Sequence, residues 1–254
     1  MTSIVVDVGN SRLKWGRCEG GVVVECVSLP GDDPVAWERQ LGWWQVGQAC
    51  VWTTCGVNPP THDRFVEWLQ ARGESVRTLK SSRDLPLQVQ VDNPDGVGID
   101  RLLNAVAAND RRRTMPEHAR GKAGILVDAG SAVTVDLVDE SGVFRGGAIL
   151  PGLRLMAMAL HDHTALLPRV EVWQSTPAAL GTSTRSAIEA GVHYAVVGAI
   201  RELIGKLMDL CRSTPITYLT GGDASLLHSS FDEQIISWPF MTLEGIRIAA
   251  EAGK

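Results

Sequence analysis

The sequence has few of the features that mark secreted or membrane-spanning chains. Its five cysteines are an odd number and include no CxxC pair, which indicates buried or incidental free thiols. The longest apolar runs are much shorter than a membrane-spanning helix requires, and the N-terminal residues do not place a basic stretch before an apolar one. We therefore expect a cytoplasmic protein with no membrane partner.

Both common nucleotide-binding fingerprints are also missing. The sequence contains no GxxxxGK[ST] motif, and Gly96-Val97-Gly98 continues to Arg101 where a GxGxxG motif needs its third glycine. A formal net charge of -5 disfavours a nucleic-acid partner. The pair His161 and His163 has no cysteine or glutamate close by, so a polar helix end is favoured over a metal site.

What the chain does have is a soluble globular composition, with 44% hydrophobic and 21% charged residues among 254. That length fits one large domain or two small ones. Six of the eight tryptophans lie in the first 68 residues and interleave with apolar positions. Core packing explains them better than a stacking platform for bases.

The most informative stretch is Ile125 to Gly152. A short apolar run ends at Asp128, a tight Ala129-Gly130-Ser131 turn follows, and a β-rich run begins at Val133. A carboxylate at the end of a buried strand can hold a cation, and glycine and serine let backbone N–H groups approach an anion. An ordinary hairpin with an aspartate turn would give the same pattern.

The start of the chain repeats this arrangement. Residues 4–11 again give an apolar strand, then Asp7, Gly9 and the hydroxyl of Ser11, before a strand-like exit through Leu13 and Lys14. Two such hairpins more than a hundred residues apart predict a duplicated architecture with two phosphate-facing turns.

Between and after the hairpins, the patterns predict a first half of order β-β-β-α-β-α-β. A helix over 102–109 would carry Asp100 and Arg101 in its first turn, where an acid is also favoured by the helix dipole alone. The polar segment 111–122 is predicted to be a solvated linker. A long helix with a buried apolar stripe is predicted to begin near residue 180. A strand is expected at 216–219 before Gly221-Gly222, and a helix at 243–250.

Five motifs in this order resemble type III pantothenate kinases, of the acetate and sugar kinase, heat-shock ATPase and actin superfamily. The resemblance implies an α/β protein with a duplicated ribonuclease-H-like (actin-like ATPase) fold, whose halves would span 1–115 and 116–254 with the active site between them. The motifs are residues 7–11, 98–101, 128–132, 146–152 and 220–222.

The same resemblance implies an activity and its residues. The family phosphorylates pantothenate to 4'-phosphopantothenate with ATP, Mg²⁺ and a monovalent cation (K⁺ or NH₄⁺), and forms homodimers whose sites are completed across the interface. By motif, Asp100 would be the catalytic base and Asp128 the monovalent-cation ligand, while Asp7 would position the Mg²⁺-bound phosphates. ATP would contact Asp7, Val8, Gly9, Asn10, Ser11, Arg12, Leu13, Lys14 and Ser131, and pantothenate would contact Gly98, Ile99, Asp100, Arg101 and, from the partner subunit, Thr184.

The chain departs from the family pattern at the pantothenate side. Val91 stands where a tyrosine is usual, and Ser11 and Ser131 replace the commoner threonines while keeping the hydroxyl. Two alternatives stay open: a kinase of the same superfamily acting on another small alcohol, and a nucleotide-binding accessory regulator without turnover. The retained carboxylates Asp7, Asp100 and Asp128 disfavour the regulator, because a regulator has no need of a base.

Overall fold

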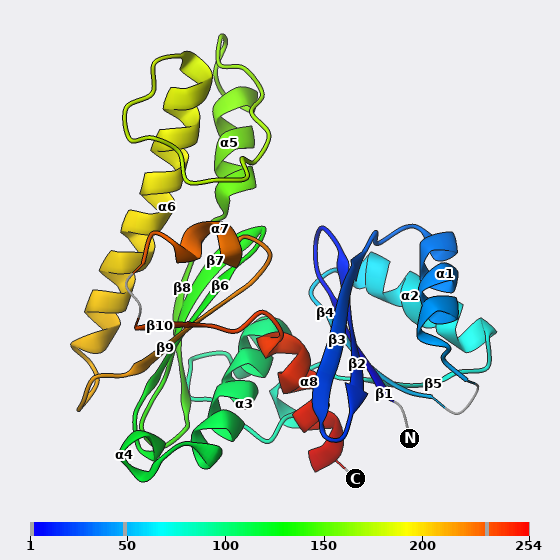
Figure 1. Cartoon of the computed structure of the whole chain (residues 1–254). Coiled ribbons are helices and arrows are strands. Elements are labelled where there is room, and N and C mark those ends of the chain that lie inside the picture. Colours follow the sequence, from blue (N-terminus) through cyan, green and yellow to red (C-terminus); the bar gives the residue numbers. More distant parts are fainter. Residues whose placement is uncertain (1–2, 48–49, 232–233, 254) are drawn as a thin grey trace. The chain divides into compact units, whose positions relative to one another are not determined.

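The computed structural model describes residues 3–47, 50–231 and 234–253, and the chain divides into two compact units. The first unit combines Met1–Pro116 with Phe240–Lys254, and the second is the continuous stretch Glu117–Pro239. Figure 1 shows a sheet in each unit, with the chain coloured from its N-terminus to its C-terminus.

The first unit is built on a five-stranded sheet of order β3-β2-β1-β4-β5. Strand β1 pairs antiparallel with β2, which pairs antiparallel with β3, while β1, β4 and β5 run parallel. With the intervening helices, this confirms the predicted order β-β-β-α-β-α-β. The bounds are β1 Ser3–Val8, β2 Leu13–Glu19, β3 Val22–Leu29, α1 Pro34–Trp44, β4 Val51–Gly56, α2 Pro59–Ala71 and β5 Ser75–Thr78.

Helices α1 and α2 begin where the local sequence supplies a cap. The Asp33 side chain accepts a hydrogen bond from Ala36 N at 3.0 Å, and Asn58 accepts one from Thr61 N at 3.3 Å. A proline follows each cap, where its missing N–H has no helical partner to lose.

Aromatic side chains form the centre of the first unit's core. Trp15, Trp37, Trp52 and Phe65 are fully buried, and the rings of Trp15 and Trp52 meet edge to face with centroids 5.2 Å apart. The expected packing role of the tryptophans is thus confirmed for these residues, whereas Trp43 is 72% exposed.

Two helices far apart in the sequence pack closely in this unit. They are α3, Ile99–Thr114, and α8, Met241–Ala252. A Cβ on Gly245 would lie 2.1 Å from Leu103 O, and Thr242 Oγ1 donates to Asn104 Oδ1 at 2.8 Å. Residues 240–254 therefore group with the first unit, whereas the expected second half, 116–254, included them.

Helix α3 is also longer than its sequence pattern predicts. It continues through Thr114, and α4, Glu117–Arg120, follows after two residues. The prediction of a linker over 111–122 was therefore wrong for most of that segment. The arginines at 111–113 occupy the last turn of α3, where positive charge opposes the negative end of the helix dipole. Two short 3₁₀ turns, Ser82–Asp84 and Pro94–Gly96, lie between β5 and α3.

The second unit repeats the topology of the first. Its five-stranded sheet has the order β8-β7-β6-β9-β10, with β6-β7 and β7-β8 antiparallel and β6, β9 and β10 parallel. The two sheets therefore match strand for strand, which confirms the predicted duplication. The strands are β6 Gly124–Ala129, β7 Ala132–Val138, β8 Phe144–Pro151, β9 Ile216–Thr220 and β10 Ile235–Ser237.

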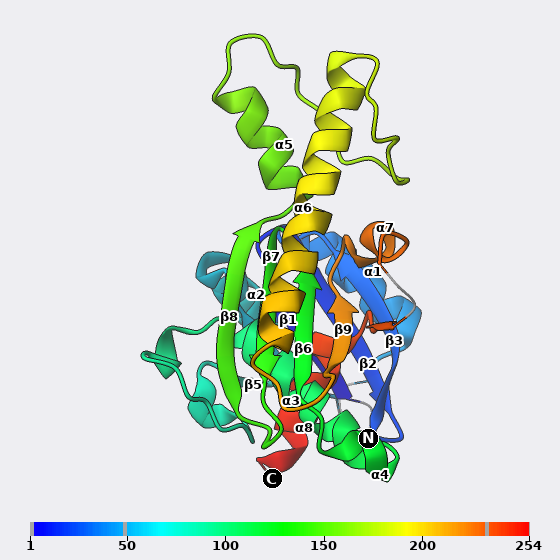
Figure 2. The same ribbon diagram turned by 90° about the vertical axis from the view of Figure 1, so that its left-hand side faces the viewer.

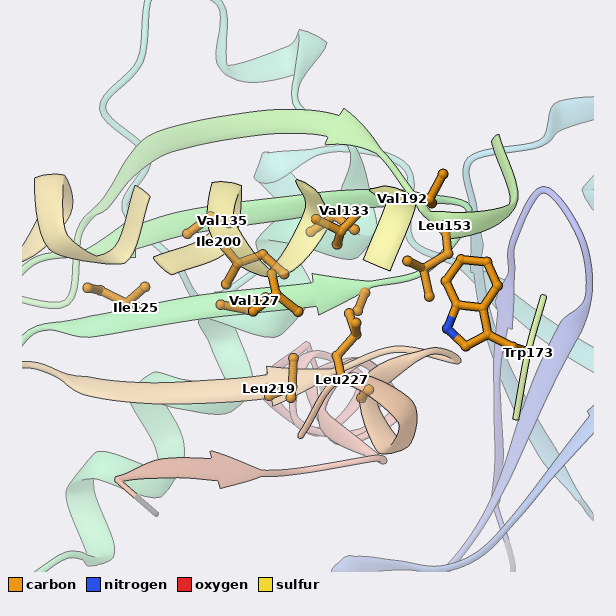
Figure 3. Packing of buried hydrophobic residues seen from close by; sticks show 14 of the residues in the cluster. Ile125, Val127, Val133, Val135, Leu153, Trp173, Val192, Ile200, Leu219 and Leu227 are labelled. Carbon is orange, nitrogen blue, oxygen red and sulfur yellow. The ribbon is translucent and has the colours of Figure 1, made fainter. Parts of the chain in front are cut away.

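Helices cover this sheet and supply the other half of its core. The long helix α6, Thr184–Met208, lies along the sheet, as Figure 2 shows, and α5, Leu153–Asp162, follows β8. The predicted stripe of α6 is confirmed at its centre, since Val192, Val196 and Ile200 are buried. Figure 3 shows Val192 and Ile200 facing side chains of β6 and β7, with Leu227 of the short helix α7, Ala224–His228, nearby. As predicted, His161 lies in the last turn of α5, and 164–172 has no regular structure.

A buried histidine in α6 makes the second unit sensitive to acid. His193 is 0% exposed; its Nε2 lies 3.0 Å from Ser230 Oγ, and its Nδ1 has no hydrogen-bond partner among the described residues. Burial lowers the pKa of His193 below its usual 6.5. The unfolded chain therefore binds this proton more tightly, so the stability is full above about pH 6.5 and falls as the pH drops below it.

We expect His193→Gln, which cannot take up a proton, to lose less stability than the parent protein between pH 7.5 and 5.5. Urea unfolding at the two pH values measures this difference. His163→Gln, at an exposed position just after α5, is the matched control and should keep the parent's pH dependence. Identical slopes for His193→Gln and the parent would show that His193 titrates normally in the folded protein.

Candidate functional site

The first predicted loop is a tight turn between β1 and β2. Gly9 N–H donates to Arg12 O at 3.1 Å and closes the turn, which leaves Asn10, Ser11 and Arg12 exposed. Asp7 stands one residue before the end of β1, in register with Lys14 of β2, and is only 7% exposed. The turn thus presents a hydroxyl and backbone N–H groups beside a carboxylate that is largely withdrawn from water.

The neighbouring strand β4 brings a second group to Asp7. Cys55 is paired in register with Asp7, is 0% exposed, and points its Sγ at Asp7 Oδ1 from 3.9 Å. Burial, followed by the charges of Asp7 and Asp100, raises the pKa of this thiol well above its usual value. Cys55 is therefore a buried thiol that lies beside the Asp7 carboxylate. The sequence alone did not mark Cys55 as a site residue.

Asp100 lies in the first turn of α3, as predicted. Gly98 is the N-cap residue, Ile99 is buried, and Asp100 and Arg101 are half-buried. Asp100 Oδ1 accepts a hydrogen bond from Arg101 N at 2.9 Å and lies 2.7 Å from the place a Cβ on Gly98 would take. The absence of a side chain at Gly98 thus makes room for the Asp100 carboxylate, at the helix end where the dipole favours negative charge.

The second predicted loop joins β6 to β7 in the second unit. Gly130 N–H donates to Ala132 O at 3.1 Å, as Gly9 does in the first loop, and Asp128 and Ser131 are half-buried on either side of it. Asp128 pairs with Thr134 of β7 and with Thr220 of β9. The two loops thus occupy equivalent positions in their sheets, and a glycine N–H closes each, although four residues separate β1 from β2 and two separate β6 from β7.

Glycines from two other motifs close around this second loop. Gly152 N–H donates to Ser131 O at 3.0 Å, and a Cβ on Gly152 would lie 2.2 Å from Gly130 O. Gly221, with φ at +103°, would place a Cβ 2.3 Å from Ala129 O and 2.5 Å from Asp128 Oδ1. Only glycine fits these approaches. The motifs at 128–132, 146–152 and 220–222 therefore meet at one place in the second unit.

Thr184 is the first residue of α6 and belongs to neither of these loops. It is exposed and opens α6, where Ser183 forms a capping box with Ser186. A Cβ on Gly181 would lie 2.3 Å from Ala187 N, so Gly181 lets the preceding loop fold against the helix. Across the described ranges, no hydrogen bond joins Thr184 to the 128–131 loop.

Over the residues that the structure describes, no group of three or more His, Cys, Asp or Glu side chains could hold a metal ion together. Mg²⁺ sites that serve phosphate chemistry need only one or two carboxylates, since water and phosphate oxygens complete the shell. Asp7, beside a loop of backbone N–H groups, fits that pattern. In the described part of the chain, no helix is both long and apolar enough to cross a membrane.

Comparison with known proteins identifies the family. The family model of type III pantothenate kinases matches residues 3–206, which include Asp7, Asp100, Asp128 and Thr184. The type III pantothenate kinase of Listeria monocytogenes is 36% identical over 168 residues, which are 66% of this chain and 61% of that protein. The enzyme of the same name from Dehalococcoides mccartyi is 30% identical over 261 residues, covering 99% of this chain and 96% of that one.

Solved structures share the fold at low sequence identity. The activator of 2-hydroxyisocaproyl-CoA dehydratase from Clostridium difficile, solved with bound ADPNP, has a TM-score of 0.54 at 14% identity and covers 100% of this chain and 97% of its own. The ethanolamine utilization protein EutJ from Carboxydothermus hydrogenoformans has a TM-score of 0.52 at 15% identity, covering 98% and 89%. These likenesses and the repeated sheets confirm the duplicated ribonuclease-H-like, actin-like ATPase fold, and the match over 3–206 shows that the chain belongs to the type III pantothenate kinase family.

Proposed function

We propose that this chain transfers the γ-phosphate of ATP to the hydroxyl of pantothenate, giving 4'-phosphopantothenate in the first step of coenzyme A synthesis. The observation that carries the proposal is the family match over 3–206, which spans the motif residues from Asp7 to Thr184. Phosphoryl transfer depends mainly on positioning and on neutralising charge, and the carboxylates beside N–H-rich turns are suited to both tasks.

In this proposal the loop of residues 7–14 receives the phosphates of ATP. Exposed Ser11 offers a hydroxyl and the Gly9 turn offers backbone N–H groups, while the buried Asp7 carboxylate positions the Mg²⁺-bound phosphates. Bound Mg²⁺ supplies charge neutralisation at the transferred group. Ser131, at the equivalent turn of the second unit, gives ATP another hydroxyl contact.

Asp100 acts as the base that accepts the proton of the pantothenate hydroxyl. Its half-buried position in the first turn of α3, within the motif of residues 98–101, supports this role. Arg101, the next residue, suits the pantothenate carboxylate because a guanidinium can bind a carboxylate through two parallel hydrogen bonds. Gly98 and Ile99 complete this contact. Val91, half-buried a few residues earlier, leaves out the ring and hydroxyl of a tyrosine.

The protein works as a cytoplasmic homodimer in this proposal. Thr184 reaches the pantothenate site of the partner subunit, which agrees with its exposure at the start of α6. Exposed apolar side chains lie on the same unit, at Leu155, Leu166, Leu180 and Tyr194. In a dimer, contact with the partner subunit would remove such apolar side chains from water.

The deciding test is ADP release by the purified protein with Mg²⁺-ATP and K⁺, with and without pantothenate. Release that requires pantothenate, together with a phosphorylated product, supports the proposed activity, and the KM for pantothenate then measures the effect of Val91. ATP binding without pantothenate-dependent release would contradict it. Other hydroxy acids and sugars would then be tested as acceptors, and a lack of turnover with all of them would favour an accessory regulator.

We expect the rate to depend on the monovalent cation, because Asp128 holds K⁺ or NH₄⁺ in this proposal. Replacing K⁺ by Na⁺ at constant ionic strength should lower kcat/KM by roughly tenfold, about 1.4 kcal/mol of transition-state stabilisation. The matched variant Asp128→Asn should be slow in both salts and respond little to the exchange. Equal rates of the parent protein in K⁺ and Na⁺ would contradict the proposed monovalent-cation site at Asp128.

A further inference from the structure

We propose that Cys55 is a positioning residue, whose buried thiol orients the Asp7 carboxylate toward Mg²⁺-ATP. This inference rests on the proposed function, because it assigns Cys55 a task in the ATP site of that reaction. Cys55 acts through Asp7 and has no contact with the reacting atoms in this proposal.

The first argument is the geometry of the two strands. Asp7 of β1 and Cys55 of β4 are register partners in a parallel pair, so their side chains lie on the same face of the sheet. The Sγ atom lies 3.9 Å from Asp7 Oδ1, within reach of a weak S–H···O hydrogen bond. A side chain at position 55 therefore meets Asp7 directly.

The second argument is that several hydrogen bonds and close contacts fix the end of β4. Val57 N–H donates to Val8 O at 3.1 Å, and a Cβ on Gly56 would lie 2.9 Å from Val8 Cβ. One residue before Cys55, Thr54 Oγ1 lies 3.0 Å from His62 Nε2 and 3.2 Å from Thr78 Oγ1. The thiol is thus attached to a rigid piece of backbone, which a positioning group requires.

The third argument concerns the burial of Asp7. A carboxylate that is 7% exposed has lost most of its water and needs hydrogen-bond donors to offset that loss. The S–H group of a cysteine is a weak hydrogen-bond donor. Cys55 therefore offers a donor to Asp7 in a site that must accept the phosphates of ATP.

The test compares Cys55→Ala, Cys55→Ser and Cys50→Ala in the full chain. Cys50 is the matched control because it is also a buried thiol, 5% exposed and just before β4, but its Sγ faces Val51 O. The measurements are the KM for Mg²⁺-ATP, the KM for pantothenate, kcat and the thermal midpoint of each variant.

Loss of one donor to a charged group is expected to raise the KM for Mg²⁺-ATP about three- to tenfold in Cys55→Ala. The KM for pantothenate should stay unchanged, and Cys55→Ser, which retains a donor, should return the KM for Mg²⁺-ATP to within about twofold of the parent. Both alanine variants lose a buried sulfur atom, so a lower thermal midpoint in both reports packing alone.

The inference fails if Cys55→Ala and Cys50→Ala raise the KM for Mg²⁺-ATP equally, or if Cys55→Ser does not restore it. Should the alanine variant not fold, Cys55→Ser and Cys55→Val decide the matter, since only the valine lacks a donor. Calorimetric titration of each variant with Mg²⁺-ATP separates this failure from failure of the proposed function, because it requires no turnover. An unchanged Kd in Cys55→Ala would overturn the inference even in an active enzyme.

Discussion

Replacing Asp100 by asparagine is expected to lower kcat by about 10² to 10⁴, the usual contribution of a general base. Asparagine has nearly the shape of aspartate, so it fits the space that Gly98 leaves open and can still accept the hydrogen bond from Arg101 N. It is a far weaker base than a carboxylate and cannot effectively accept the proton of the pantothenate hydroxyl. The change therefore removes the proposed chemistry and preserves the start of α3.

Steady-state kinetics, calorimetric titration with Mg²⁺-ATP and analytical gel filtration together measure this variant. ATP binding and the size of the assembly should match the parent protein. Asp110→Asn, nearer the end of the same helix, is the control and should be fully active. Near-normal turnover of Asp100→Asn would require a different base, and a loss of ATP binding would indicate that Asp100 serves the nucleotide instead.

The second large effect is expected at Gly221. In Gly221→Ala the new Cβ would fall 2.3 Å from Ala129 O and 2.5 Å from Asp128 Oδ1, and the residue would have to keep a φ of +103°. The left-handed conformation costs about 1–2 kcal/mol and the crowding about 1–3 kcal/mol more, so we expect a loss of roughly 2–5 kcal/mol in unfolding free energy. Because the contact includes Asp128, turnover should fall as well.

The adjacent glycine provides a matched control. A Cβ on Gly222 would meet no atom within 4 Å, so Gly222→Ala should unfold within about 0.5 kcal/mol of the parent. Urea unfolding of the two variants measures the difference. Equal stabilities would mean that β9 and the β6–β7 loop can separate at little cost, and that Asp128 does not depend on Gly221 for its position.

The sequence allowed most of the sheet topology to be predicted, because strand patterns are local. The apolar runs before Asp7 and Asp128 and the turns after them identify both hairpins, and the repeat predicts that the sheets match. The short strand β10 was missed, since three residues give too little periodicity to recognise. The predicted end of helix α3, at residue 109, was too early. The charged residues that follow were interpreted as a solvated linker, but they are equally compatible with the exposed face of a helix.

The site was less accessible to sequence reasoning, since its parts meet only after folding. The sequence indicated that Gly221-Gly222 allows either a ligand or a sharp turn, and the structure gives Gly221 a close approach to Asp128 in the turn before α7. Cys55 carried no signal, because a cysteine at a strand end is most often ordinary packing. Its contact with Asp7 depends on the pairing of β1 with β4, which are separated in the sequence by two strands and a helix.

Because the last helix of the chain, α8, belongs to the first unit, the two units are expected to fold in a different order from that of their synthesis. A ribosome releases the continuous stretch 117–239 before it has made α8, and this stretch contains a whole sheet with its own core. In the first unit, the apolar face of α3 stays uncovered until α8, Met241–Ala252, has been synthesised and can pack against it. Fragments that end at residue 239 should therefore be protected from protease in the middle of the sequence while its beginning stays sensitive, the reverse of the usual N-terminal-first order.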